Sequence, residues 1–263
     1  MKLSHADARR AMERDPGRWL YVLLDLAHPV RCRGVSIWAA DPEQLDDCAV
    51  LTDFAEGTTL RFFGRSMDLL EEAASDPAVR MGTRLCFCGG VPEGFAGHAG
   101  RHRFRPDPVG RSLDRYGLFG FQTAYRRASP PEGWTVQEAA EADFEEFYSL
   151  DRGVWGSFPD EIGEFGIRDR LWLACAADDE YGGYLWATEA GRAYYDIVNV
   201  YVRPDLRGRG LGGALVSRYV SSAMAAGRRA YYGYAVTRES AALARSLGFR
   251  EIYGETVSFF AQD

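Results

Sequence analysis

A glycine-rich, basic turn between a strand pattern and a helix pattern, residues 198–215 (VNVYVRPDLRGRGLGGAL), constrains the fold of this sequence most. The run before it, 193–202, is rich in β-branched and aromatic residues, which predicts a β-strand. After it, Leu211, Leu215, Tyr219 and Ala223 repeat every four residues, which predicts an α-helix over 211–226. This strand, turn and helix favour an α/β fold.

The chemistry of the turn is that of an anion-binding site. Its glycines leave consecutive backbone N–H groups unobstructed, and the start of the helix adds the positive end of its dipole. Arg207 and Arg209 add positive charge. A glycine-rich surface loop without a ligand is the alternative interpretation.

A dinucleotide-binding loop is a competing interpretation of the same glycines. Gly208, Gly210 and Gly213 formally satisfy G-x-G-x-x-G. That fingerprint needs an acidic residue about 20 positions on, at the end of the next strand. Ala235 and Val236 stand there instead, so the context is wrong for a dinucleotide.

Strands alternate with helices along most of the chain, which predicts a mixed sheet with helices against it. Strands are expected at 34–39, 48–54, 58–64, 84–88, 171–177, 182–189, 193–202 and 230–236, with a final strand pair near 251–260. Helices are expected to begin at Ser66 and to cover 136–150, 211–226 and 239–247, and residues 89–110 are expected to form a loop. Residues 129–133 (SPPEG) are the clearest linker, which predicts two lobes, 1–128 and 129–263.

Composition excludes several classes of function. The net charge of −7 argues against a protein that coats nucleic acid or an anionic membrane. No apolar run approaches the ~20 residues of a membrane span, and residues 1–15 lack a signal-peptide core. Five cysteines in apolar surroundings, with no metal-ligand spacing, favour reduced thiols in the cytoplasm and no metal.

Two motifs together carry a family resemblance. Arg207-x-x-Gly210-x-Gly212 follows a V-x-V strand, and Ser240-x-x-Leu243-x-x-x-Leu247-Gly248-Phe249 follows the next strand. Both resemble motifs of the GNAT superfamily of N-acyltransferases, in the family's order and spacing, over residues 134–260. The resemblance implies a mixed sheet flanked by helices and splayed between its fourth and fifth strands, with acetyl-CoA as co-substrate in the gap.

The resemblance also implies roles for individual residues. The backbone of Val200, Tyr201 and Val202 is expected to pair with pantetheine, and Val200 is assigned as the N–H that faces the thioester carbonyl. Thr237 and Ser240 are expected near pantetheine. The pyrophosphate is expected on Arg207, Gly208, Arg209, Gly210, Leu211, Gly212 and Gly213.

The first lobe resembles, more loosely, the degenerate amino-terminal half of the pseudo-tandem glycine N-acyltransferase-like proteins. It shares with them an order of three strands, a helix and a strand, without a sharp motif. A smaller GNAT-like lobe is therefore expected before the acyltransferase domain, and an unrelated α+β lobe is the alternative.

Asp196 is the candidate general base. It lies within the apolar run YYDIVNV, eleven residues before Arg207, a spacing at which this superfamily places a basic carboxylate. Burial there raises a carboxyl pKa toward useful values. A strand carboxylate paired with an arginine is the competing interpretation. The family's general-acid tyrosine corresponds to Ala244, but a thiol with a pKa of about 8.5 leaves readily as a thiolate.

The leading hypothesis is an acetyl-CoA-dependent N-acetyltransferase that acylates a primary amine of a small molecule or amino acid by direct attack. No nucleic acid, membrane or metal partner is expected, and the protein is expected to be a monomer or homodimer. A non-catalytic acyl-CoA-binding module or sensor, and a peptide or protein N-terminal acetyltransferase, are the alternatives. Trp155, Phe158 and Trp172 lie near the region where the resemblance puts the acceptor pocket, although core packing is the favoured explanation for each of them.

Overall fold

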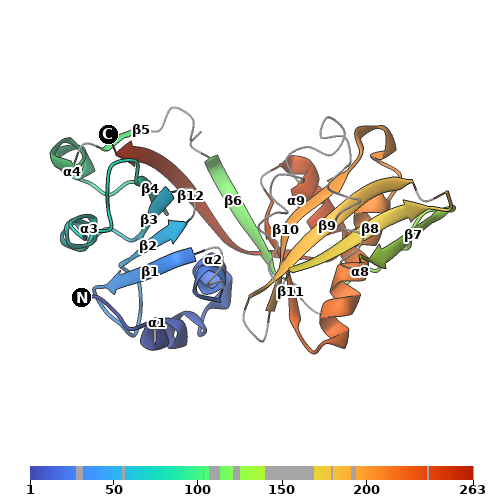
Figure 1. Ribbon diagram of the computed structural model, residues 1–263, viewed down its shortest axis with the longest axis horizontal. Helices are drawn as coiled ribbons and strands as arrows, with labels where there is room; N and C mark the ends of the chain where they lie inside the picture. The colour runs from blue at the N-terminus through green and yellow to red at the C-terminus, as the bar shows by residue number, and fades with distance from the viewer. Residues whose placement is uncertain are drawn as a thin grey trace. The chain divides into compact units, whose positions relative to one another are not determined.

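Two compact units make up the computed structural model of the protein: Met1–Tyr116 with Tyr253–Asp263, and Gly117–Ile252 (Figure 1). The described residues are 1–27, 32–54, 57–102, 104–106, 113–120, 125–139, 169–178, 180–190, 194–235 and 237–262. The domain boundary at 128/129 stays a prediction, because the limits of a compact unit need not coincide with those of a domain.

The sheet of the first unit has the strand order β1-β2-β3-β4-β12, with β5 also paired to β12. Its neighbours are antiparallel except β3 and β4, which are parallel. Its strands are β1 Cys32–Ala39, β2 Cys48–Phe54, β3 Gly57–Phe63, β4 Arg84–Cys88, β5 Phe104–Pro106 and β12 Arg250–Gln262.

Helices cover both faces of this sheet. Residues of α1 (His5–Met12) and α2 (Pro16–Ala27) share one apolar cluster with Ile37, Val50 and Phe63. Residues of α3 (Met67–Ala74) and α4 (Phe95–His102) share another with Leu51, Leu60 and Phe62. Neighbouring strand residues thus face opposite clusters, as the two-residue period of a strand requires.

The prediction for residues 89–110 was wrong, because this segment contains α4 and β5 rather than a continuous loop. The sequence does not predict α4 because two of its residues, Gly97 and Gly100, have low helix propensity. Its buried Phe95, which packs edge-on against Phe87 with ring centroids 4.5 Å apart, ties it to the sheet. The helix predicted to begin at Ser66 is confirmed: the Ser66 hydroxyl accepts a hydrogen bond from the N–H of Leu69.

The sheet of the second unit has the order β6-β11-β10-β9-β8-β7. Only β10 and β11 are parallel, and α8 (Leu211–Ala225) connects them and contacts the sheet. The other elements are β6 Leu113–Gly120, β7 Trp134–Glu138, β8 Asp169–Ala176, β9 Tyr181–Ala190, β10 Tyr194–Val202, β11 Arg229–Tyr234 and α9 Arg238–Ser246. No helix in the described ranges is long and apolar enough to cross a bilayer.

Two further predictions need correction. Residues 136–138 belong to β7 rather than to the start of a helix, because β7 pairs with β8 and its Trp134 and Val136 pack against the core beneath α8. Residues 140–150 of that predicted helix lie outside the described residues. The strand pair expected near 251–260 is the single strand β12, which pairs with β4 over Val257–Ala261.

The two units follow one plan. In each, a run of antiparallel strands, β1-β2-β3 in the first unit and β7-β8-β9-β10 in the second, ends in a strand that is parallel to the next one, and a helix makes the crossover: β3-α3-β4 and β10-α8-β11. The last strand of each sheet comes from elsewhere in the chain. β12 borders β4, and β6 borders β11.

The turn before α3 is occupied by a side chain of the protein itself. Asp47 Oδ1 accepts hydrogen bonds from the N–H groups of Arg65 at 2.5 Å and Ser66 at 3.0 Å. Gly64 has a φ of +116°, and a Cβ there would collide with the same carboxylate. The start of the crossover helix in the first unit thus already holds an anion.

Replacing Asp47 with Ala is expected to lower the free energy of unfolding by about 1–3 kcal/mol, because two backbone N–H groups lose a charged acceptor. Urea unfolding of the purified protein measures the change. Asp46→Ala is the matched control: Asp46 makes a surface ion pair at 3.6 Å to Arg18, so its loss costs less than about 1 kcal/mol. Equal losses in the two variants contradict the role of Asp47.

Candidate functional site

The strands β10 and β11 are paired over only three residues. Tyr194, Tyr195 and Asp196 pair with Arg229, Ala230 and Tyr231. Beyond Asp196, β10 continues against β9 as far as Val202, and β11 continues against β6. The sheet therefore forks after Asp196, and residues 197–202 have an edge with no strand partner within the described chain.

The register of β9 and β10 shows which backbone groups point into the fork. Arg203 donates its N–H to the carbonyl oxygen of Gly182 at 3.0 Å. Antiparallel strands alternate between residues that bond to each other and residues that do not. Val202 and Val200 therefore direct their N–H and C=O groups away from β9, toward the open edge.

The helix α8 begins beside this edge without a side-chain cap. Gly210 is its N-cap, at a φ of +93°, and contributes no side-chain hydrogen bond. The first N–H groups of a helix have no acceptor within it, so the start of α8 offers unpaired donors and the positive end of the dipole to an anion.

Gly208 and Gly210 have positive φ angles, and a Cβ at either position would meet no atom within 4 Å, so conformation is what requires glycine there. Gly212 and Gly213 differ. A Cβ on Gly212 would lie 3.3 Å from Leu243, and one on Gly213 would lie 3.2 Å from Ala128. The first two glycines shape the turn, whereas the second two allow α8 to pack closely.

Arg207 is fixed by two contacts next to the turn. Its Nε donates to the carbonyl oxygen of Val202 at 3.0 Å, and its guanidinium lies 5.6 Å from the centre of the Tyr201 ring. That ring stacks on Tyr184, 5.6 Å away. Arg207 and Arg209 are exposed, and neither forms an ion pair with a carboxylate of the described residues.

Asp196 is buried at the point where the fork begins, with 1% of its surface exposed. Tyr195 and Ile197 pack in the cluster beneath α8, so Asp196 lies on the opposite face of the sheet. Burial raises the pKa of its carboxyl well above the usual value, against a smaller opposing hydrogen bond from the N–H of Ile197. Its Oδ1 has no hydrogen-bond partner among the described residues, so the alternative of an arginine ion pair finds no support there.

The residues of the second motif already bond within the protein. Thr237 caps α9 by accepting the N–H of Ser240 at 3.1 Å, and the Ser240 hydroxyl lies 3.2 Å from that of Tyr232. Ala244, a residue of α9, is fully buried in the core of the second unit. Trp172 is buried in the core, whereas Trp155 and Phe158 lie outside the described residues. No group of three or more metal-ligating side chains occurs in the described ranges.

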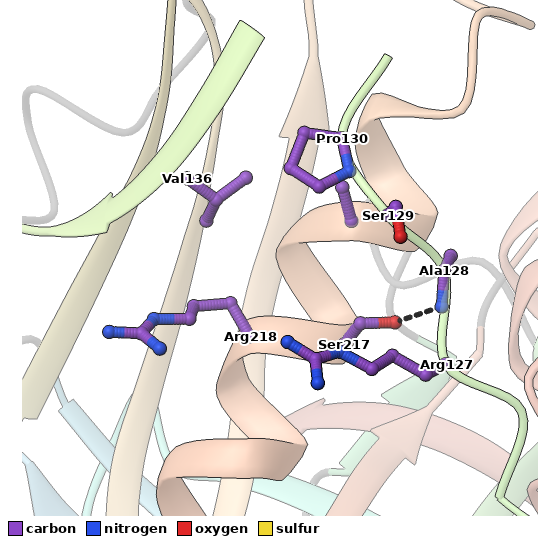
Figure 2. Close-up of a pocket in the computed structure, with 8 residues that line it drawn as sticks. Arg127, Ala128, Ser129, Pro130, Val136, Ser217 and Arg218 are labelled. Atoms are coloured by element: carbon purple, nitrogen blue, oxygen red, sulfur yellow. Dashed lines mark hydrogen bonds between the residues drawn. The ribbon is translucent and has the colours of Figure 1, made fainter.

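The segment 125–130 runs along α8. The Ser217 hydroxyl accepts the N–H of Ala128 at 2.8 Å, as Figure 2 shows, and the Tyr125 hydroxyl donates to the carbonyl of Ser217 at 3.0 Å. A small cavity of about 170 Å³ lies here, lined in part by Arg127 and Arg218. These two hydrogen bonds hold the segment against α8.

Sequence reasoning missed the role of Tyr219. Its hydroxyl lies 2.8 Å from the carbonyl oxygens of both Tyr195 and Tyr231, one on each branch of the fork. In the sequence, Tyr219 is one member of the apolar stripe along α8. Its hydroxyl is the only polar group in that stripe, and it was the one feature that could have indicated a further role.

Part of the chain matches a known family of protein domains. Residues 168–251, which lie within the second unit, match the family model described as an acetyltransferase (GNAT) domain. No curated protein matches the sequence.

Solved structures extend the likeness of fold to nearly the whole chain. A GCN5-related N-acetyltransferase from Kribbella flavida is 14% identical with a TM-score of 0.57, covering 94% of this chain and 95% of that one. A tandem GNAT protein from the clavulanic acid biosynthesis pathway is 14% identical with a TM-score of 0.56, covering 95% of each chain. A Drosophila protein is 14% identical with a TM-score of 0.61, covering 99% and 97%.

Residues 168–251 thus match a GNAT domain, and the likeness of the rest of the chain to the solved structures is one of fold. The predicted fold class is confirmed: a mixed, splayed sheet flanked by helices, with a GNAT-like lobe before it. The likeness of the first lobe to glycine N-acyltransferase-like proteins in particular stays a prediction, as do the roles of the individual site residues.

The raised pKa of Asp196 gives a testable pH dependence of stability. The unfolded carboxyl ionises near pH ~3.9, and the folded one ionises at higher pH because it is buried. The resulting stabilisation is fully present below ~3.9, declines as the pH rises and is lost once the pH passes the folded pKa. Asp196→Asn cannot ionise, so we expect its melting temperature relative to wild type to increase between pH 4 and pH 8.

Thermal unfolding of both proteins across that pH range measures the difference. Asp178→Asn, a change at an exposed turn carboxylate that forms no ion pair with the described residues, is the control and is expected to leave the profile parallel to wild type. A parallel profile for Asp196→Asn contradicts a raised pKa.

Proposed function

We propose that the protein transfers an acetyl group from acetyl-CoA to a primary amine of a small molecule or amino acid by direct attack. The observation that carries the proposal is the fork after Asp196, which leaves a strand edge open beside the uncapped start of α8. Chemically these parts fit the two ends of the co-substrate, because pantetheine amides pair with strand backbone and a pyrophosphate suits a helix start.

The pyrophosphate is assigned to the turn from Arg207 to Gly213. The unpaired N–H groups of Leu211, Gly212 and Gly213 lie in the first turn of α8. The bond from Arg207 Nε to Val202 fixes the guanidinium while its terminal nitrogens remain available to phosphate oxygens. Thr237 and Ser240 stay candidates for pantetheine contacts, in competition with the bonds that they make within the protein.

In the proposed reaction the amine nitrogen attacks the thioester carbonyl carbon, a C–N bond forms and the C–S bond breaks. The N–H of Val200, directed into the fork, stabilises the oxyanion. Ionised Asp196 accepts the proton that the nitrogen loses, through a water because an aspartate side chain is short. CoA leaves as a thiolate, which a proton from the solvent neutralises.

A small acceptor is favoured by the face on which Asp196 lies. The neighbouring strands present Leu171, Leu173, Tyr184 and Trp186 there, all at most 1% exposed. Such an enclosed, aromatic surface leaves little room for a folded protein surface as acceptor.

Binding of CoA tests the turn. We expect calorimetry to give about one site per chain, because Asp47 already fills the corresponding turn of the first unit. The double variant Arg207→Ala, Arg209→Ala is expected to weaken binding about tenfold or more and to reduce its salt dependence. Arg33→Ala, an exposed change on β1, is the control. An unchanged dissociation constant in the double variant contradicts the assignment.

Turnover tests the reaction. Release of free thiol from acetyl-CoA is measured against a panel of amino acids, amino sugars and polyamines, with mass spectrometry of the products. Asp196→Asn is expected to lower kcat about a hundredfold or more while binding acetyl-CoA as tightly as wild type. If acetyl-CoA binds and no amine supports turnover in the wild type, the catalytic proposal is wrong.

A non-catalytic acyl-CoA-binding module is the second candidate. It is favoured by the buried Ala244 at the family's tyrosine position and by the enclosure of Asp196. Recovery of unchanged acetyl-CoA after incubation with the amine panel supports this candidate over the first.

A further inference from the structure

We propose that Tyr219 is a positioning residue for acyl transfer: its hydroxyl fastens β10 to β11 where the fork begins and thereby fixes the peptide that carries Asp196. The inference rests on the proposed function. It concerns a residue that neither contacts the open strand edge nor belongs to the glycine turn.

The contact joins both branches at once. Tyr219 Oη lies 2.8 Å from the carbonyl oxygen of Tyr195 on β10 and 2.8 Å from that of Tyr231 on β11. A phenol carries a single hydrogen, so it donates to one carbonyl at a time. Both carbonyls belong to the end of the paired stretch, because Asp196 and Tyr231 are the last partners. The hydroxyl thus bridges the two strands at the point where they separate.

The bridge acts directly on Asp196 through covalent geometry. The carbonyl of Tyr195 and the N–H of Asp196 belong to one planar peptide unit. A hydrogen bond that fixes this carbonyl therefore fixes the orientation of the Asp196 backbone, and with it the direction in which the carboxylate leaves the sheet.

The Tyr219 ring is itself held firmly. It has no exposed surface, Trp172 of β8 packs edge-on against it at 5.7 Å, and the Tyr195 ring lies 6.4 Å away. Burial, with a further contribution from the charge of Asp196, raises the pKa of the phenol well above its usual value. The hydroxyl therefore keeps its proton, and can donate it, at neutral pH.

The first unit offers an internal comparison. Its parallel strands β3 and β4 pair over five positions, Thr59–Phe63 with Arg84–Cys88, and do not separate. The crossover helix above them, α3, has the sequence MDLLEEAA and contains no tyrosine. The unit without the bridging hydroxyl is thus the one whose parallel pair stays closed.

Steady-state kinetics of Tyr219→Phe test the inference. We expect kcat to fall about tenfold, because the orientation of the base is lost, while the dissociation constant of acetyl-CoA changes less than about threefold. The pH at which kcat reaches half its maximum is expected to shift, a readout that a merely structural role does not move.

Tyr125→Phe is the matched control. It also removes a tyrosine hydroxyl bonded to a carbonyl, that of Ser217 on the same helix, at a point away from the fork. It is expected to keep the kcat and the pH profile of wild type. Equal losses in the two variants, or a Tyr219→Phe enzyme with unchanged kcat and pH profile, overturn the inference. Absence of turnover in the wild type instead removes the proposed function on which it rests.

A second measurement covers the case in which Tyr219→Phe does not fold. Hydrogen–deuterium exchange of the wild-type protein reports the opening of residues 194–196 and 229–232. If the Tyr219 hydroxyl holds the two strands together, the backbone amides of these segments are expected to exchange as slowly as those at the centre of α8. Rapid exchange there, with α8 protected, overturns the inference.

Discussion

The short parallel pairing of β10 and β11 is the constraint on which the second unit depends. Three residues pair and the strands then separate, so backbone groups that a sheet normally satisfies need other partners. The fold provides some of these itself: Arg207 Nε donates to the carbonyl oxygen of Val202, and the Tyr219 hydroxyl donates to the carbonyl oxygen of Tyr195 or of Tyr231. The remaining open edge is the part of the sheet that a ligand with amide groups can complete.

The elements most visible in the sequence are those whose signal is local. The turn from Arg207 to Gly213, the stripe along α8 and the Ser66 cap each depend on residues within a few positions of one another. By contrast, four of the seven residues that follow Phe95 in α4 are glycines or histidines, and the helix is held by packing of Phe95 against Phe87 and Phe260. A helix stabilised by distant partners leaves little trace in its own composition.

The candidate site shows the same division. Asp196 was conspicuous as a carboxylate in an apolar strand, and its burial follows from that pattern. The direction of the Val200 and Val202 backbone depends on a register shift between Ile197 and Asn199, which no spacing rule reveals. The Tyr219 bridge depends on two strands and a helix meeting, so only the assembled unit makes it recognisable. The roles of Thr237 and Ser240 in pantetheine binding stay predictions. Their hydroxyl groups already form hydrogen bonds within the protein, and the sequence motif alone does not reveal those bonds.

The strand that borders β4 has a consequence for biosynthesis. The residues of β12 that pair with β4, Val257–Ala261, follow the whole second unit in the sequence, although β4 belongs to the first. While the ribosome is still making the second unit, the edge of β4 has no β12 beside it and exposes unpaired backbone groups. The first unit therefore completes its sheet only after the second has been synthesised, and until then the β4 edge is open to pairing with another strand.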